Sequence, residues 1–194
     1  MSSMWKYRFA ADMAKYLYSL YLEAVDQAAG GPYDLAHLIE VRRDAIALRP
    51  WLAAGESAHC SELAFPIVLS EPFHRLRVLC SDAIVVQNDV YSLFKDLSND
   101  ERSSQAIFLI RNYGYTAEQS IDYLEQKHCE IVREYQDVES STQFQAERYG
   151  VPEEKSNLDC YLSMMRSWMS GNNAWSSETV RYSHNVPSTW VQGQ

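Results

Sequence analysis

The sequence predicts an all-α fold, a single bundle of six to seven helices, and three observations support this prediction. Apolar residues recur at helical spacing through nearly all of the 194 residues. Clusters of Gly, Pro, Ser and Asn separate these helical patterns. The sequence has no β-hairpin signal, and its main β-branched run, Ile84-Val85-Val86, falls inside a helical period.

The N-terminal half is expected to form four helices. The first covers about residues 5–29, and Gly30-Gly31-Pro32 ends it. The second covers about 34–48 and is closed by Pro50, and the third covers about 52–60 and continues into a short piece after Pro66. The longest helix begins after Pro72 and ends at the break formed by residues 98–100. Within the first helix, the residues at helical spacing are Phe9, Met13, Tyr16, Leu17, Leu20 and Ala24.

The C-terminal half continues the same pattern. A helix is expected over 103–112, with Gly114 after its end. Thr116 is a predicted N-cap with Gln119 three residues later, and the helix that follows reaches at least residue 144. Residues 150–152 form a turn. The final helix is predicted over 153–170, with an irregular tail after Gly171.

Composition narrows the class of protein. Hydrophobic residues make up 46% of the chain, which is enough for a folded core. The net charge of −9 argues against nucleic acid as the main partner. No apolar run reaches the ~20 residues of a membrane span, and the N-terminus lacks the apolar core of a signal peptide. The four cysteines are widely spaced, which favours reduced thiols in a cytoplasmic protein over a zinc site.

The most informative motif lies near the end of the longest predicted helix. Asn88, Ser92 and Asp96 recur every four residues, so their side chains share one stripe of the helix. All three carry oxygen donors, which suit Mg²⁺ that keeps waters and binds substrate phosphate. Lys95 supplies a positive charge beside the stripe for that phosphate. The pattern therefore predicts a metal and diphosphate site, although a solvated helix face has the same spacing.

With two further features, Arg42 and the pair Arg181-Tyr182, the chain resembles the C-terminal half of a class I terpene synthase, most like the fungal sesquiterpene cyclases. In that family an Asn/Asp-Asp-x-x-Ser/Thr-x-x-Lys-Glu signature binds Mg²⁺, and residues 88–96 match it except for Asp96 in place of Glu. A diphosphate-sensing arginine lies some forty positions upstream, where Arg42 stands, and an Arg-Tyr pair lies near the C-terminus.

The resemblance implies a truncated helical bundle and a role for each matched residue. Arg42, Lys95, Arg181 and Tyr182 would bind diphosphate, and Asn88, Ser92 and Asp96 would bind Mg²⁺. Trp175 is close to where the family places an aromatic that faces the carbocation, and Phe65, Tyr91 and Trp168 are weaker candidates. The implied reaction is ionisation and cyclisation of a prenyl diphosphate, farnesyl diphosphate above all.

Each of these residues also has an ordinary structural interpretation. Arg42 could be an exposed helix charge, Arg181-Tyr182 a surface dipeptide, and Trp175 a core or cap residue. The sequence also departs from the family. The aspartate-rich motif that binds the other metal ions is absent, and the chain begins where the second half of the family begins. Relatives often have Gly near Ala47, where a helix breaks.

Three hypotheses follow. The first is a Mg²⁺-dependent terpene cyclase. The second is an inactive remnant or interaction module, which depends on a missing N-terminal half or on a homo-oligomer because helices that normally face partners would expose apolar surface. The third, an unrelated helical scaffold, requires all three spaced matches to be coincidental. In the first two, the whole chain, residues 1–194, is one domain, the C-terminal part of a terpene synthase metal-binding domain.

Overall fold

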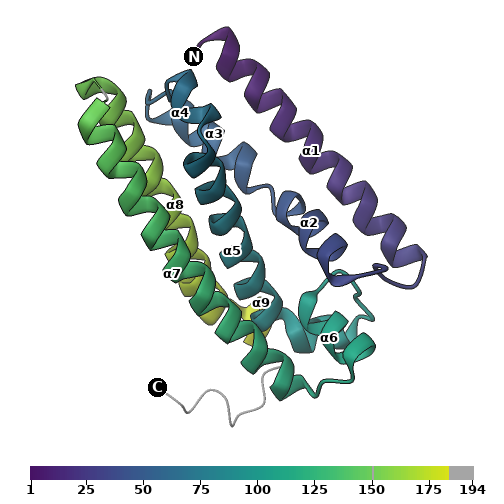
Figure 1. The fold of residues 1–194 in the computed structure, drawn as a ribbon. Helices are drawn as coiled ribbons and strands as arrows, with labels where there is room; N and C mark the ends of the chain where they lie inside the picture. The colour runs from purple at the N-terminus through teal and green to yellow at the C-terminus, as the bar shows by residue number, and fades with distance from the viewer. Residues whose placement is uncertain (150, 184–194) are drawn as a thin grey trace.

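The computed structural model describes residues 1–149 and 151–183, and over these ranges the chain is helical and has no strand, which confirms the all-α prediction (Figure 1). Its helices are α1 (Ser3–Ala28), α2 (Leu35–Ala45), α3 (Leu48–Ala58), α4 (Phe65–Leu69), α5 (Glu71–Ser98), α6 (Gln105–Tyr113), α7 (Ala117–Tyr149), α8 (Pro152–Glu178) and α9 (Val180–Ser183). None of the described helices is long and apolar enough to cross a membrane.

Helix α5 is the centre of the bundle. It packs against α7 and α8 on one side and against α2 and α6 on the other, and α1 runs along the outer edge beside α2 and α3 (Figure 1). The larger apolar cluster joins α3, α5, α7 and α8, and its fully buried members include Leu52, Phe73, Leu76, Tyr161 and Leu162. A smaller cluster joins α5, α6 and α7 around Leu93, Ile107 and Leu124. Because α5 is enclosed on several sides, polar side chains that it carries need partners from other helices.

The expected helix ends are largely confirmed. Thr116 and Gln119 form the predicted capping box, in which the Gln119 N–H donates to Thr116 Oγ1 at 3.1 Å and the Thr116 N–H donates to Gln119 Oε1 at 2.9 Å. Gly114 follows α6 with a φ of 74°, as a C-terminal glycine should. Pro50, expected to close a helix, instead lies in the first turn of α3. The N–H groups of a first turn make no hydrogen bond within the helix, so the lack of an N–H in proline costs nothing there.

The irregular tail predicted after Gly171 is wrong as far as the structure describes it. Helix α8 continues through Gly171 to Glu178, and α9 follows. A glycine inside a helix costs only about 1 kcal/mol. A tertiary contact offsets that cost, since Asn172 Nδ2 donates to Gln87 Oε1 on α5 at 2.8 Å. Residues 184–194 of the tail lie outside the described residues.

The break between α2 and α3 falls where the sequence has Ala47 rather than glycine. Ala47 adopts a left-handed conformation with φ 59° and ψ 15°, and it separates Ala45, the last residue of α2, from Leu48, the first of α3. The left-handed region costs an L-residue roughly 1–2 kcal/mol. The tertiary structure therefore holds the break against the local preference of the residue.

We expect Ala47→Gly to raise the free energy of unfolding by about 0.5–1 kcal/mol, because relief of the left-handed strain outweighs the extra freedom of glycine in the unfolded chain. Chemical denaturation of the two proteins side by side would measure the change. Ala47→Val is the matched comparison, and it should be less stable than the parent because a β-branched side chain tolerates this conformation poorly. If Ala47→Gly were less stable than the parent protein, the left-handed conformation of Ala47 would not be strained.

Helix α1 is attached to the bundle by charges. Its Arg8 pairs with Glu56 at 2.8 Å, its Asp12 with Arg77 at 2.7 Å and its Glu23 with Arg42 at 3.2 Å. Near its end, Asp26 hydrogen-bonds His37 at 2.8 Å. Three of these four contacts use carboxylates of α1. The inner side of α1 therefore carries four charged residues beside partly buried apolar ones, which are Trp5, Phe9, Met13, Tyr16 and Leu22.

Candidate metal and diphosphate site

The oxygen-bearing stripe of α5 faces the interior of the protein. Ser92 and Asp96 are buried, and Asn88 is half-buried. The Ser92 hydroxyl donates to Asp96 Oδ2, and the ammonium of Lys95 pairs with Asp96 Oδ1. The alternative of a solvated helix face does not describe this stripe, because its two C-terminal members are almost completely shielded from water.

Arg42, which lies on α2, reaches the first residue of the stripe. Its Nη2 donates to Asn88 Oδ1 at 3.1 Å and to Asp89 Oδ1 at 2.8 Å, and its Nη1 donates to Glu23 Oε1 at 3.2 Å. Although burial lowers the pKa of Arg42, the carboxylates of Asp89 and Glu23 raise it above its ordinary value. Arg42 is therefore a charged, largely buried group at the site, and the alternative of an exposed helix charge does not describe it.

Tyr182 meets the same asparagine from the C-terminal end of the described chain. Its hydroxyl accepts a hydrogen bond from Asn88 Nδ2 at 2.9 Å, and its ring, which is buried, lies 6.4 Å from the ring of Tyr91. The Trp175 ring packs edge-on against it at 5.9 Å. Asn88 thus contacts residues 46 positions before it and 94 positions after it in the sequence.

Arg181 and Trp175, unlike Arg42 and Tyr182, are exposed. The Arg181 guanidinium lies 5.7 Å from the centre of the Tyr182 ring, and Arg181 is exposed. Trp175 is also exposed, as is Trp168 two turns before it on α8, whose ring lies 6.3 Å from that of Trp51 on α3. The structure therefore brings Arg42, Asn88 and Tyr182 together, while Arg181 and Trp175 contact the Tyr182 ring and Trp168 contacts Trp51 instead.

One buried partner of Arg42 was given no role from the sequence. Asp89 is completely buried, and besides Arg42 it accepts a hydrogen bond from the N–H of Gln105, the first residue of α6, at 2.9 Å. Burial raises the pKa of this carboxyl, and the Arg42 guanidinium and the Gln105 N–H oppose that rise. The available signal was a charged residue three positions after the apolar run that ends at Val86, because a carboxylate buried on such a helix needs a partner.

Comparison with known proteins identifies the family. Residues 1–134 match the family model described as terpene synthase family 2, C-terminal metal binding. The chain belongs to the terpene synthase family. It is 29% identical over 187 residues to a germacrene A synthase of Nostoc punctiforme, covering 95% of this chain and 55% of that protein. It is 28% identical to a pristinol synthase of Streptomyces pristinaespiralis, covering 92% of this chain and 48% of that protein.

Solved structures give the same picture of the fold of this terpene synthase chain. The linalool/nerolidol synthase of Streptomyces clavuligerus superposes with a TM-score of 0.83 at 22% identity, over 91% of this chain and 60% of that chain. An α-eudesmol synthase superposes with a TM-score of 0.81 at 23% identity. The chain spans about half the length of the curated relatives it matches, as expected for a C-terminal half. The fungal type stays a prediction.

The donor set of this terpene synthase chain fits a hard divalent cation. The stripe offers an amide oxygen, a hydroxyl and one carboxylate, and Asp96 Oδ1 is buried beside the Lys95 ammonium. Arg42 Nε is also buried, without a hydrogen-bond partner. Among the described residues there is no group of three His, Cys, Asp or Glu side chains that could hold a metal ion.

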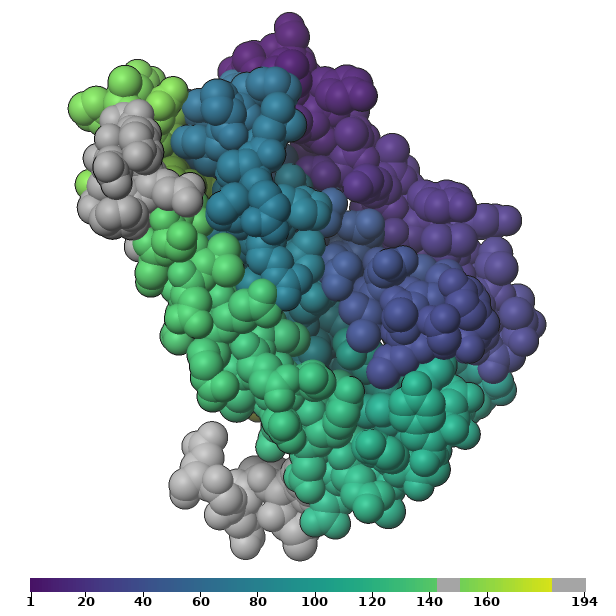
Figure 2. All heavy atoms as spheres, in the orientation of Figure 1, coloured from purple at the N-terminus to yellow at the C-terminus, as the bar shows by residue number. Residues whose placement is uncertain are grey.

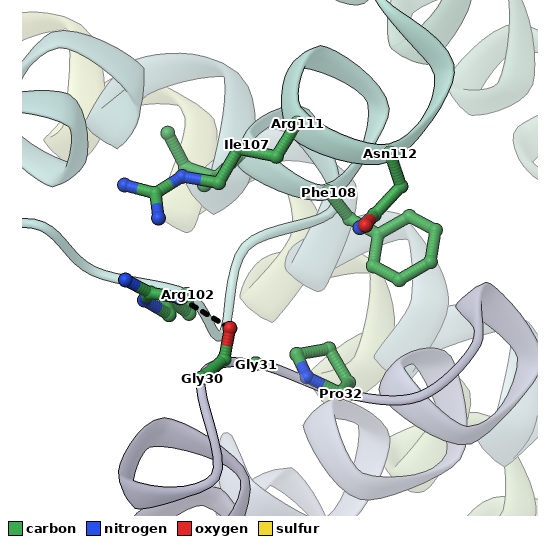
Figure 3. A pocket seen from close by; sticks show the side chains of 8 residues that line it. All are labelled: Gly30, Gly31, Pro32, Arg102, Ile107, Phe108, Arg111 and Asn112. Carbon is green, nitrogen blue, oxygen red and sulfur yellow. Dashed lines mark hydrogen bonds between the residues drawn. The ribbon is translucent and has the colours of Figure 1, made fainter.

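A cavity of about 170 Å³ lies elsewhere in the protein, between the α1–α2 turn and α6 (Figure 3). Gly30, Gly31 and Pro32 form one side of it, and Ile107, Phe108 and Asn112 form another. Arg102 donates to the Gly30 carbonyl, and Arg102 and Arg111 both pair with Asp100. None of the predicted site residues lines this cavity, so it is separate from the candidate site.

Proposed function

We propose that this chain supplies the metal- and diphosphate-binding half of a terpene cyclase, which ionises a prenyl diphosphate and cyclises it with release of diphosphate. Farnesyl diphosphate is the proposed substrate and Mg²⁺ the proposed cofactor. The observation that carries the proposal is Asn88, which hydrogen-bonds Arg42 on α2 and Tyr182 on α9 at the same time. Three matched parts of the family pattern meet at this one residue. The named activities of the sesquiterpene synthases to which the chain is similar support the choice of reaction.

Each residue has a proposed role in this reaction. Asn88, Ser92 and Asp96 would hold Mg²⁺, which when bound would neutralise the charge that develops on the leaving diphosphate. Arg42 donates to a phosphate oxygen through its unpaired Nε–H, and Lys95 adds a point charge. Arg181, which is exposed, and the Tyr182 hydroxyl, which is bonded to Asn88, would also bind the diphosphate. The exposed ring of Trp175 faces the carbocation, which an aromatic face stabilises by roughly 0.5–2 kcal/mol.

The alternative function is a partner-dependent or inactive module. The chain spans about half of its relatives, and residues 1–194 contain no aspartate-rich motif. The site residues also hydrogen-bond one another, since Asn88 donates to Tyr182 and Ser92 donates to Asp96. A partner that supplies the other half of the bundle would complete the pocket. In this alternative the chain binds diphosphate without turning over a prenyl substrate.

The test separates binding from turnover. Titration of inorganic diphosphate with Mg²⁺ into the pure chain should give saturable binding, and Arg181→Ala should weaken it by tenfold or more, because a hydrogen bond to a charged group is worth about 1.5–3 kcal/mol. Arg75→Ala is the matched control, since Arg75 pairs with Glu134 on the surface away from the site. Incubation with farnesyl diphosphate and analysis of volatile products then distinguishes an active cyclase from the partner-dependent module. No diphosphate binding in the parent chain would overturn the proposal.

A further inference from the structure

Gln87, the residue before Asn88 on α5, hydrogen-bonds side chains of two other helices. Its Oε1 accepts a hydrogen bond from Asn172 Nδ2 on α8 at 2.8 Å, and its Nε2 lies 3.0 Å from His128 Nε2 on α7. Because the amide oxygen already accepts from Asn172, the amide nitrogen is the group that donates to the imidazole. Gln87 is buried, and it therefore joins three helices from inside the protein.

His128 has the protonation state that this hydrogen bond requires. Burial lowers the pKa of its imidazole, which favours the neutral ring. A neutral ring with its proton on Nδ1 can accept the hydrogen bond from Gln87 through Nε2. In the space-filling view of Figure 2, α7 forms an outer margin of the molecule, so its half-buried histidine lies between solvent and the buried amide. Both ends of the Gln87 amide are thus hydrogen-bonded.

The end of α8 needs such an anchor, because few of its side chains are buried. In the last two turns of α8 every side chain is exposed except those of Asn172, which is half-buried, and Ser176, which is buried. Segments with few buried contacts open most readily. The hydrogen bond to Gln87, and a second one from the Tyr91 hydroxyl to Asn173 Oδ1 at 3.1 Å, therefore attach this helix end to α5.

The same helix end leads to two residues with a proposed role in diphosphate binding. Helix α9 follows α8 directly and carries Arg181 and Tyr182. Figure 1 shows α9 beside α5 at the end of α8. Trp175 links α8 to α9, since its carbonyl accepts from the Thr179 N–H and its ring packs against that of Tyr182. The position of the end of α8 therefore determines where Arg181 and Tyr182 lie.

We propose that Gln87 is a positioning residue for diphosphate binding, which holds the end of α8 against α5 so that Arg181 and Tyr182 reach the diphosphate. This inference rests on the proposed function and adds to it a residue that acts through other residues. An apolar side chain of the same length would fill this space without burying an amide, which costs free energy unless it is hydrogen-bonded. What only the amide supplies is a pair of directed hydrogen bonds to α7 and α8.

Hydrogen exchange of the pure chain without ligand tests the positioning. Gln87→Met keeps the length of the side chain and removes both hydrogen bonds. Asn172 and His128 are half-buried and can turn to water, so the denaturant midpoint should stay close to that of the parent. Exchange from Asn172 to the end of α9 should be about two- to tenfold faster, the effect of one lost hydrogen bond. Gln126→Met, at an exposed position of α7 that bonds Glu130 of the same helix, is the matched control and should leave this exchange unchanged. Unchanged exchange in Gln87→Met would overturn the proposal.

Titration with inorganic diphosphate and Mg²⁺ tests the consequence for binding. Gln87→Met should bind at least threefold more weakly than the parent, because only chains with the end of α8 in place are competent. In a chain that already carries Arg181→Ala and Tyr182→Phe, where Arg42 and the metal remain, Gln87→Met should cause no further loss. A further loss there would overturn the proposal, since Gln87 would then act through its neighbour Asn88.

The two proposals fail in different ways. A parent chain that does not bind diphosphate would overturn both of them. A parent chain that binds diphosphate with an affinity that Gln87→Met leaves unchanged would overturn the role of Gln87 alone.

Discussion

Asp89→Ala is expected to lower the free energy of unfolding by about 3–5 kcal/mol, the cost of removing one partner from a buried ion pair. The substitution leaves the Arg42 guanidinium with Glu23 and Asn88 alone and removes the acceptor of the Gln105 N–H at the start of α6. Burial already raises the pKa of Glu23, which makes that carboxyl a poor replacement. Denaturant titration followed by circular dichroism would measure the loss.

Two variants separate the contributions of Asp89. Asp89→Asn keeps an acceptor for the Gln105 N–H but removes the charge that faces Arg42, so it should lose less stability than Asp89→Ala. Asp122→Ala, at an exposed position of α7, is the matched control and should change stability by no more than about 0.5 kcal/mol. If Asp89→Ala were as stable as the Asp122 variant, Asp89 would not be the residue that holds Arg42 at the site.

The second large effect is expected at Glu56, in the contact between α1 and α3. Glu56 is fully buried, and its carboxylate accepts two hydrogen bonds from Arg8, at 3.0 and 2.8 Å, and one from the Leu63 N–H at 3.1 Å. Glu56→Ala leaves a largely buried guanidinium and a buried N–H without partners. We expect a loss of about 3–5 kcal/mol, measured as a lower denaturant midpoint with an unchanged slope.

A double variant tests the reason for this loss. Replacing both groups, as Arg8→Met with Glu56→Met, removes the unpaired charge and fills the space with apolar atoms. It should therefore be more stable than Glu56→Ala alone, because buried pairs replaced by apolar side chains cost little. Equal or lower stability in the double variant would mean that the pair contributes through its own attraction rather than through the penalty of breaking it.

The sequence was sufficient for the helical class, because the spacing of apolar residues and the capping signals are local. Thr116 and Gln119 illustrate this, since the residues that predict the cap also form it. The end of α8 was not predictable from Gly171, because the hydrogen bond of Asn172 to Gln87 on the distant helix α5 supports the helix beyond that glycine. Local preference is a weak signal wherever such packing opposes it.

The residues of the candidate metal and diphosphate site were predictable in part, as the helix ends were. The spacing of Asn88, Ser92 and Asp96 gave one stripe, and the resemblance to a family gave Arg42 and Tyr182, which the structure places beside Asn88. Spacing could not show that Arg181 lies over the Tyr182 ring, because the orientation of α9 depends on its packing. For α1, helical spacing could not distinguish the buried side from the exposed one, and Leu17 is exposed.

The ionic attachment of α1 also determines where this helix can sit along its own axis. A helix held only by an apolar face can shift by one turn, about 5.4 Å, along its axis and still contact apolar neighbours. If α1 slid by one turn, Asp12 would take the place of Arg8 and a carboxylate would confront Glu56. The one positive and three negative charges on the inner side of α1 therefore permit a single position of this helix along its axis, which a uniform apolar contact would not do.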